Sequence, residues 1–289
     1  MLHIQVPEIL KAHKQLSTED LSFVYYNEHA PAGRHLISFN QYAVSFILSG
    51  QKELYRGAEC QTFNERDAVL IPRGNAVIAE RKLKTEKYSS LVIFFAPKLA
   101  EDFLSKYISK RNNTEYGNQK SSTESFLQFR QTPYCKEYTN ALIHLIEMQV
   151  PVQPILLHHK LEELFLIMLE TCPAQFFKIF SSSGGNDDNK LRQVVENNLL
   201  NNLTLTELAF LSNRSLAKFK RDFEKEYHIS PGKYIRERKL DIAKHSINEG
   251  QPVNNISALL GYDNISNFIS AFKKKFGQTP QGYRSRLEI

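Results

Sequence analysis

The sequence has 289 residues, of which 42% are hydrophobic, so it is long and apolar enough for two ordinary domains and is not an intrinsically disordered chain. It has no stretch of about 18 apolar residues, no basic start followed by an apolar run, and three widely separated cysteines, so we expect a soluble cytoplasmic protein without membrane contacts. The net charge is +6, and residues 186–289 hold 17 basic and 12 acidic residues, against 20 and 19 in residues 1–185. A basic C-terminal third is what binding to a polyanion requires.

Residues 21–95 show short β-type runs separated by turn residues. The predicted strands are residues 21–26, 36–39, 42–48, 52–55, 68–71, 76–80 and 90–95. Short strands about ten residues apart favour a small antiparallel β barrel or sandwich. Alternate residues from Tyr42 to Leu48 are large and apolar, so one face of that strand is expected to lie against an apolar interior.

The order of these segments resembles the jelly-roll barrel of the cupins, with SFILSG at 45–50 and RDAVLIPRGNAV at 66–77. For an enzymatic cupin, the resemblance implies that histidine and carboxylate side chains hold a metal inside the barrel. This chain has Val77 and Ile78 after Pro72-Arg-Gly. We therefore expect no enzyme, no metal and no cofactor, and keep a metal-dependent cupin enzyme as an alternative.

The N-terminal region also has candidates for an effector pocket. Tyr42 and Phe46, with Arg34 or Arg73 nearby, are expected to line a site for an apolar molecule that bears an acidic group. A stripe of Phe and Tyr at strand spacing is more often part of a plain core than of a pocket. A protein-interaction and dimerisation module without a small ligand is a second interpretation of this domain.

The middle of the chain predicts helices over 98–108, 133–149 and 154–171, with an exposed loop at 109–125. In 133–149 the expected face contains Tyr138, Ala141, Leu142, Leu145, Met148 and Gln149; in 154–171 it contains Leu157, Leu161, Leu164, Met168 and Cys172. These helices are expected to cover the barrel or to pack against a second subunit. Gly and polar residues at 181–189 predict a linker between a domain at 1–180 and a domain at 190–289.

An internal repeat dominates the C-terminal region. Seven pairs of residues lie 49 positions apart: Leu216 and Ile265, Phe219 and Phe268, Phe223 and Phe272, Tyr227 and Phe276, Ser230 and Thr279, Pro231 and Pro280, Tyr234 and Tyr283. A repeat of this length is one supersecondary unit used twice. The spacing within each copy predicts two helix-turn-helix motifs, at about 204–226 and 253–275.

In the first copy, Thr204 and Glu207 predict a capping box, Asn213 a left-handed turn, and Ser215 the cap of the second helix. If Phe219 and Phe223 face inward, the outward residues of that helix are Ala217, Lys218, Lys220 and Arg221. Small and basic side chains at the start of a second helix suit the major groove.

In the second copy, Gly261 predicts the turn, which is one residue longer than in the first copy, and Asp263 or Asn264 the cap. Ile265, Phe268 and Phe272 are expected inward, and the outward residues expected are Ser266, Asn267, Ile269, Ser270 and Lys273. A helix from Pro231 to about Asn248 is predicted to connect the copies, about 34 Å or one DNA turn apart.

At this point the residues resemble the AraC/XylS family of transcription regulators. The resemblance covers about 190–287, and its most specific part is GYDNISNFISAFKKKFGQTPQGYR at 261–284. It implies a seven-helix DNA-binding domain and commonly a cupin-like N-terminal regulatory domain. The fold class expected is thus α+β with two domains, an antiparallel β barrel with flanking helices and an all-α domain.

The resemblance also implies which residues face the bases. In the first motif these are Ala217, Lys220 and Arg221, and in the second they are Ser266, Asn267 and Ser270. Family members usually have Arg at the place of Ser270 and Ala at the place of Ser257. Without a long cationic donor at 270, we expect the second motif to act mainly on phosphates, and the phosphate contacts expected overall are Lys218, Asn264, Lys273 and Lys274.

The sequence therefore predicts a sequence-specific DNA-binding transcription regulator controlled by an effector or partner at its N-terminal barrel. The partners expected are double-stranded promoter DNA and RNA polymerase, while a small-molecule effector and a homodimer stay open.

Overall fold

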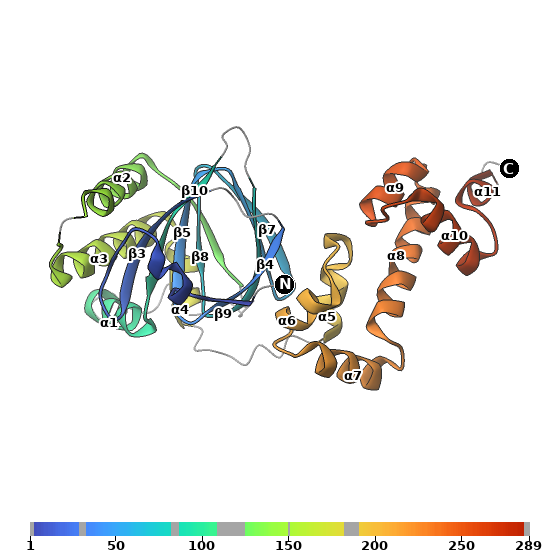
Figure 1. Cartoon of the computed structure of the whole chain (residues 1–289), viewed down its shortest axis with the longest axis horizontal. Coiled ribbons are helices and arrows are strands. Elements are labelled where there is room, and N and C mark those ends of the chain that lie inside the picture. Colours follow the sequence, from blue (N-terminus) through green and yellow to red (C-terminus); the bar gives the residue numbers. More distant parts are fainter. Residues whose placement is uncertain are drawn as a thin grey trace. The chain divides into compact units, whose positions relative to one another are not determined.

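A computed structural model describes residues 3–28, 33–81, 87–108, 125–149, 151–181 and 191–285. The chain divides into two compact units, of which the first comprises residues 1–56 and 60–187 and the second residues 57–59 and 188–289 (Figure 1). The predicted loop at 109–125 and linker at 181–189 lie almost entirely outside the described residues. The domain boundary therefore stays a prediction.

The first unit contains two β-sheets with mostly antiparallel pairing. The five-stranded sheet runs in the order β1 (His3–Val6), β4 (Arg34–Phe39), β9 (Gly74–Arg81), β6 (Gln51–Arg56) and β7 (Glu59–Asn64). The six-stranded sheet runs in the order β11 (Leu127–Arg130), β8 (Asp67–Ile71), β5 (Tyr42–Ser49), β10 (Tyr88–Phe95), β3 (Leu21–Glu28) and β2 (Gln15–Ser17). A parallel pair joins β1 to β4. The fold is jelly-roll-like, but the two sheets do not close into the barrel that we expected.

Four helices lie on one side of the six-stranded sheet (Figure 1). They are α1 (Pro97–Ile108), α2 (Pro133–Met148), α3 (Pro154–Thr171) and α4 (Pro173–Ser181); a short 3-10 helix, η1 (Glu8–Ala12), follows β1. The predictions of the first three helices are confirmed, whereas α4, η1 and the strands β1, β2, β7 and β11 were not expected.

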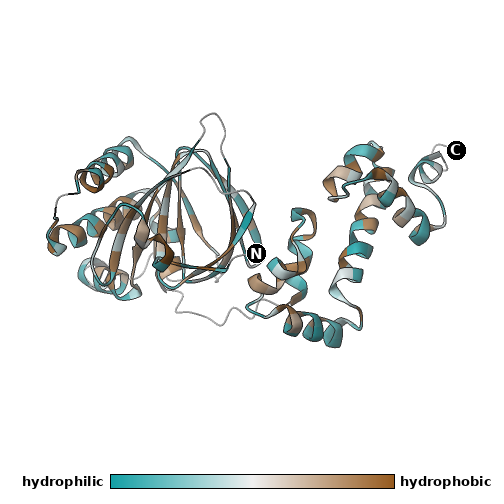
Figure 2. Ribbon diagram, viewed as in Figure 1, coloured by the Kyte–Doolittle hydropathy of each residue, from teal (hydrophilic) through white to brown (hydrophobic). Residues whose placement is uncertain are grey.

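Two apolar cores result from the alternation of side chains along the strands. On β5, Val44 and Phe46 lie in the core between the six-stranded sheet and the helices. Ala43 and Ile47 on the same strand lie in the core between the two sheets. The stripe from Tyr42 to Leu48 therefore packs against helices and not in the interior of the sandwich. Figure 2 shows hydrophobic residues along the sheets and on the helices that cover them.

The buried face of α2 differs from the predicted one. Its buried residues are Cys135, Tyr138, Thr139, Leu142 and Ile146. Met148, which we placed on the apolar face, is 54% exposed, and Ala141 and Gln149 are exposed too, because the face packed on the sheet is turned toward Thr139 and Ile146. The face predicted for α3 is confirmed at Leu157, Leu161, Leu164 and Met168.

The second unit contains seven α-helices among its described residues. These are α5 (Leu191–Asn197), α6 (Leu205–Leu211), α7 (Leu216–Tyr227), α8 (Pro231–Asn248), α9 (Val253–Leu259), α10 (Ile265–Phe276) and α11 (Pro280–Ser285), and η2 (Leu199–Asn201) follows α5. Helices α5, α6 and α7 pack together near the start of α8, and α9, α10 and α11 pack on its other end (Figure 1). Both predicted helix-turn-helix motifs and the connecting helix are present.

Candidate nucleic-acid interface

The first helix-turn-helix begins at a capping box. The Glu207 backbone N–H donates to the Thr204 hydroxyl at 3.2 Å, and the Thr204 backbone N–H donates to the Glu207 carboxylate at 2.6 Å. These bonds satisfy backbone donors that the start of a helix otherwise leaves free, so α6 begins at Leu205. The predicted capping box is confirmed.

The turn between α6 and α7 is held by backbone conformation and by one arginine. Asn213 has φ +54°, the left-handed conformation that the sequence predicted there. The Arg214 guanidinium donates to the Ser212 carbonyl at 2.8 Å and to the Asp222 carboxylate at 3.4 Å. Because Asp222 lies in the middle of α7, these bonds hold the turn against that helix.

Helix α7 buries one face and exposes the other. Ser215 caps it by accepting a hydrogen bond from the Lys218 backbone N–H at 3.3 Å, and Phe219 and Phe223 are fully buried. Its exposed residues include Ala217, Lys218, Lys220 and Arg221. The Arg221 side chain is 76% exposed. In Figure 2, α7 is largely hydrophilic. The outward orientation of all four residues agrees with the prediction, and their contacts with bases or phosphates stay a prediction.

Helix α10 exposes a different set of side chains. It follows a turn that is one residue longer than the first and contains Gly261 at φ +74°. Asn264 caps it by accepting a hydrogen bond from the Ser266 backbone N–H at 2.8 Å. Its exposed residues include Ser266, Asn267, Ser270, Lys273 and Lys274. The prediction for Ile265 is wrong, since this first residue of the helix is 37% exposed. The prediction for Ile269 is also wrong, since this residue is partly buried against the core of the second motif.

The three lysines at the end of α10 differ in their contacts. The Lys275 ammonium donates to the Asp241 carboxylate at 2.7 Å and to the Glu237 carbonyl at 2.6 Å, both on α8. Lys275 therefore holds α10 on the connecting helix. Lys273 and Lys274 are exposed beside it.

The 49-residue repeat of the sequence is also a repeat of the structure. Helices α7 and α10 begin and end 49 residues apart, as do their caps. In the first copy the Phe223 and Tyr234 ring centroids are 5.4 Å apart, and in the second the Phe272 and Tyr283 centroids are 6.0 Å apart. The aromatic residues that predicted the repeat are those that pack each second helix against the element after it.

Helix α8 is attached to both copies. Near its start, Arg238 forms an ion pair with Glu196 of α5 at 3.1 Å, and the Tyr234 hydroxyl also donates to Glu196. Burial raises the pKa of Glu196, but the hydrogen bonds from Arg238 and Tyr234 outweigh it and lower the pKa. Further along, the Lys239 ammonium donates to Asn202 at 2.6 Å and to the Leu260 carbonyl at 2.8 Å. Lys239 thus joins the end of η2 to the turn of the second motif.

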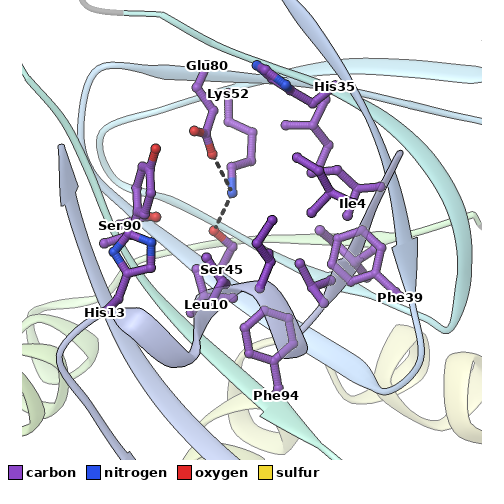
Figure 3. A pocket seen from close by; sticks show the side chains of 17 residues that line it. Ile4, Leu10, His13, His35, Phe39, Ser45, Lys52, Glu80, Ser90 and Phe94 are labelled. Carbon is purple, nitrogen blue, oxygen red and sulfur yellow. Dashed lines mark hydrogen bonds and ion pairs between the residues drawn. The ribbon is translucent and has the colours of Figure 1, made fainter. Parts of the chain in front are cut away.

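The first unit contains a cavity of about 320 Å³ between its two sheets (Figure 3). The residues predicted to line an effector pocket do not line it: Arg34, Tyr42, Phe46 and Arg73 are absent from its wall. Tyr42 and Phe46 pack in the core under the helices because their positions on β5 point away from the second sheet. Arg34 donates to the Tyr55 hydroxyl at 3.1 Å. The predicted effector site therefore lies on the other face of β5 from this cavity.

The wall of this cavity is mostly apolar with a few polar groups. Ser45 of β5, Lys52 of β6, Glu80 of β9 and Ser90 of β10 meet on one side (Figure 3). The sequence signal for them was a polar residue at an inward position of an otherwise apolar strand, as in AVIAE at 76–80. That signal needs the strand register to be interpreted, since Lys52 lies opposite Glu80 only through the pairing of β6 with β9.

Two features that the described residues lack bear on other functions. In these ranges no three His, Cys, Asp or Glu side chains are grouped so that they could hold a metal ion. No helix in the described part of the chain has both the length and the apolar character needed to cross a membrane.

Two family models match the chain. The ExsA N-terminal regulatory domain matches residues 42–179, and a helix-turn-helix domain matches residues 206–286. With the duplicated motif on α6–α7 and α9–α10, these matches define a DNA-binding transcription regulator. Together they cover about three quarters of the sequence. The chain belongs to the AraC/XylS family, as the motif at 261–284 indicated.

The chain is similar along most of its length to several described proteins. The thermoregulatory protein LcrF of Yersinia pestis is 22% identical over 253 residues, which is 86% of this chain and 91% of LcrF. The virulence regulon transcriptional activator VirF of Yersinia enterocolitica has the same identity and coverage. Among solved structures, ToxT of Vibrio cholerae with bound unsaturated fatty acid is 13% identical, covers 92% of this chain and 95% of its own, and has a TM-score of 0.43.

Proposed function

We propose that the two helix-turn-helix motifs divide the work of DNA binding. In the first, Ala217, Lys220 and Arg221 contact base edges in the major groove and Lys218 contacts a phosphate. In the second, Asn264, Lys273 and Lys274 contact phosphates, and Ser266, Asn267 and Ser270 discriminate bases weakly. The observation that carries this proposal is the contrast between the exposed faces of α7 and α10. In the major groove, Lys and Arg donate hydrogen bonds to the acceptor atoms of guanine. A short hydroxyl side chain can bond to a donor or to an acceptor of a base, so it distinguishes bases less well.

The connecting helix supports binding to two successive turns of DNA. Its 18 residues span roughly 27 Å at the usual rise of an α-helix. Ion pairs and hydrogen bonds at Glu196, Asn202 and Leu260 attach it to both copies. One chain then binds an asymmetric DNA site. The first motif reads the base sequence of one half-site, and the second motif contacts mainly the phosphate backbone of the other.

Selection of bound duplexes from random DNA with the full chain tests this division. We expect one well-defined half-site and, about ten base pairs away, a half-site with little sequence preference. Arg221→Ala should remove the preference at one position of the defined half-site, whereas Ser270→Ala should leave the selected sequence unchanged. Two equally defined half-sites would contradict the division.

We further propose that the chain acts at promoters in the cytoplasm, with RNA polymerase as a partner. The name of VirF describes a transcriptional activator, and the relatives cover most of this chain. We also propose that the N-terminal unit is regulatory and not catalytic, because Val77 and Ile78 occupy positions where enzymatic cupins carry ligands and are buried as core residues. Transcription in vitro from a selected site, with and without the protein, tests the role at promoters.

Control by an effector is assigned to the cavity between the two sheets. A mostly apolar cavity with a few convergent polar groups is the usual form of a small-molecule site. A ligand that binds there must raise the unfolding midpoint by mass action, so thermal-shift screening of the full chain tests for it.

Homodimerisation through α2 and α3 is the second candidate role of the N-terminal unit. Tyr134, Met148, Ile155 and Leu166 are large apolar residues of these helices, and each is between 46% and 67% exposed. Light scattering of the full chain and of Ile155→Glu tests this role, since a dimer that uses this surface should dissociate in the variant.

A further inference from the structure

The cavity of the first unit has an apolar body and one polar side. Its apolar wall comes from both sheets and from η1, and includes Ile4, Leu10, Phe39, Ile78, Val92 and Phe94 (Figure 3). At about 30 Å³ for each small group, the volume of a water molecule in the liquid, 320 Å³ holds about ten non-hydrogen atoms. The site therefore has room for a small molecule and not for a peptide.

The cation on the polar side already has its counter-charge. Lys52 is 4% exposed, its ammonium donates to the Ser45 hydroxyl at 3.0 Å, and it lies 3.5 Å from the Glu80 carboxylate. Lys52 and Glu80 are direct partners in the pairing of β6 with β9, so the strand register holds them together. A buried charge pair of this kind is neutral overall, and a third charge added beside it would have no partner.

The neighbouring uncharged groups are the ones that lack partners. Ser90 is 1% exposed, and its hydroxyl has no partner of normal hydrogen-bond geometry among the described residues; the Tyr88 hydroxyl, with which it interacts, is likewise buried without such a partner. The His35 Nε2 atom, on another side of the same wall, is also buried without a hydrogen-bond partner among the described residues. Leaving a buried polar atom unpaired is unfavourable, so a ligand that supplies a hydroxyl or carbonyl to either atom gains affinity.

We propose that this cavity binds an uncharged amphipathic molecule, with an apolar body of about ten non-hydrogen atoms and an alcohol, ketone or amide group that hydrogen-bonds Ser90 or His35. This inference rests on the proposed role of the cavity in effector control and names the class of effector. It replaces the acidic ligand expected from the sequence, because Glu80 neutralises Lys52 and repels a carboxylate. Burial also lowers the pKa of Lys52, although Glu80 opposes the effect, so this cation is a poor binding group for an additional anion.

The test compares two probes of equal length, decan-1-ol and decanoate, on the full chain. We expect decan-1-ol to raise the unfolding midpoint and to bind with a dissociation constant at least about tenfold lower than that of decanoate. Ser90→Ala should raise the dissociation constant of decan-1-ol by a few-fold, because the ligand loses its hydrogen bond to the Ser90 hydroxyl. The affinity for a selected promoter duplex is measured with and without each probe.

Two charge variants make the test specific. Glu80→Gln leaves Lys52 without a counter-charge, so the preference should shift toward decanoate, while Glu53→Gln, on the same sheet but outside the cavity wall, should not change it. If Glu80→Gln does not fold, the double variant Lys52→Met with Glu80→Gln removes both charges and should still prefer decan-1-ol.

The outcomes separate the inference from the proposed function. Tighter binding of decanoate by the unaltered chain, or binding of neither probe, would overturn the uncharged ligand class. Preference for decan-1-ol without any change in promoter affinity would uphold the ligand class and overturn control of DNA binding through the cavity.

Discussion

The two helix-turn-helix motifs have equivalent buried residues but different exposed faces. Phe219 and Phe223 in the first motif and Phe268 and Phe272 in the second are all fully buried at equivalent positions. The exposed faces of α7 and α10 share almost nothing, since one carries Lys220 and Arg221 and the other hydroxyl and amide side chains followed by lysines. The inward residues are fixed by packing, whereas the outward residues are free to differ and thus to specialise. Four predictions test how far this comparison holds.

Removal of one core aromatic residue should have the largest effect and should be nearly equal in the two motifs. Phe223→Ala and Phe272→Ala each delete a ring that is fully buried and packed on three others. Each should lower the free energy of unfolding by about 3–5 kcal/mol, measured by chemical denaturation. Ser270→Ala, on the exposed face of α10, is the control. A loss below about 1 kcal/mol in one motif would show that the two cores are not equivalent.

The two turns should respond unequally to alanine. Gly261 has φ +74°, and a Cβ atom there would lie 2.3 Å from the Asn202 amide oxygen, which also accepts the hydrogen bond from Lys239. Gly261→Ala should therefore lower the free energy of unfolding by about 2–3 kcal/mol, more than the strain of a left-handed alanine alone.

Asn213 has φ +54°, so Asn213→Ala introduces only the strain of a left-handed alanine and should lower the free energy of unfolding by about 1 kcal/mol. Asn213→Gly should change the free energy of unfolding little, because glycine adopts this conformation readily. Equal losses for Gly261→Ala and Asn213→Ala would mean that Asn202 moves aside freely and that its contact with the second turn is weak.

The exposed faces should differ in sequence specificity. Arg221→Ala should weaken binding to the selected site by about 1–3 kcal/mol with little effect on random DNA, because a base contact is lost. Ser270→Ala should change both affinities by less than about 0.5 kcal/mol. Gel-shift titrations on the two duplexes measure this difference. If Arg221→Ala weakens binding to random DNA by the same amount, Arg221 contacts a phosphate and not a base.

The motifs show what a sequence can reveal about a fold. The spacing of Leu216, Phe219, Phe223 and Tyr227, repeated 49 residues later, predicted the helices α7 and α10, because each large apolar residue has to face the same core. The same spacing also predicted that Ile265 faces inward, but this residue is 37% exposed. A position at the very start of a helix has the right spacing but lies beyond the packed part of the motif.

The cavity shows what the sequence could not reveal. Alternation along β5 correctly predicted that Tyr42 and Phe46 share a face, but it does not say which of two cores that face meets. The polar side of the cavity joins residues from four strands, and Lys52 meets Glu80 only through the register of two strands that are distant in sequence. Hydrophobic periodicity contains no information about that register, so the site residues were missed although the strands were found.

The smallest predicted effect distinguishes two adjacent lysines of the second motif. Lys274 is exposed, so Lys274→Ala should weaken binding to every duplex by a similar factor and reduce the slope of log affinity against log salt by about 0.9, the value for one phosphate contact. Lys275→Ala is the matched control: it removes the same charge from a side chain already bonded to Asp241 and Glu237, so the salt slope should change less while stability falls. Titrations of both variants between low and physiological salt give the slopes directly. If the slopes of Lys274→Ala and the unaltered chain coincide, the second motif holds DNA through other groups and the anchor has to be sought at Asn264 and Lys273.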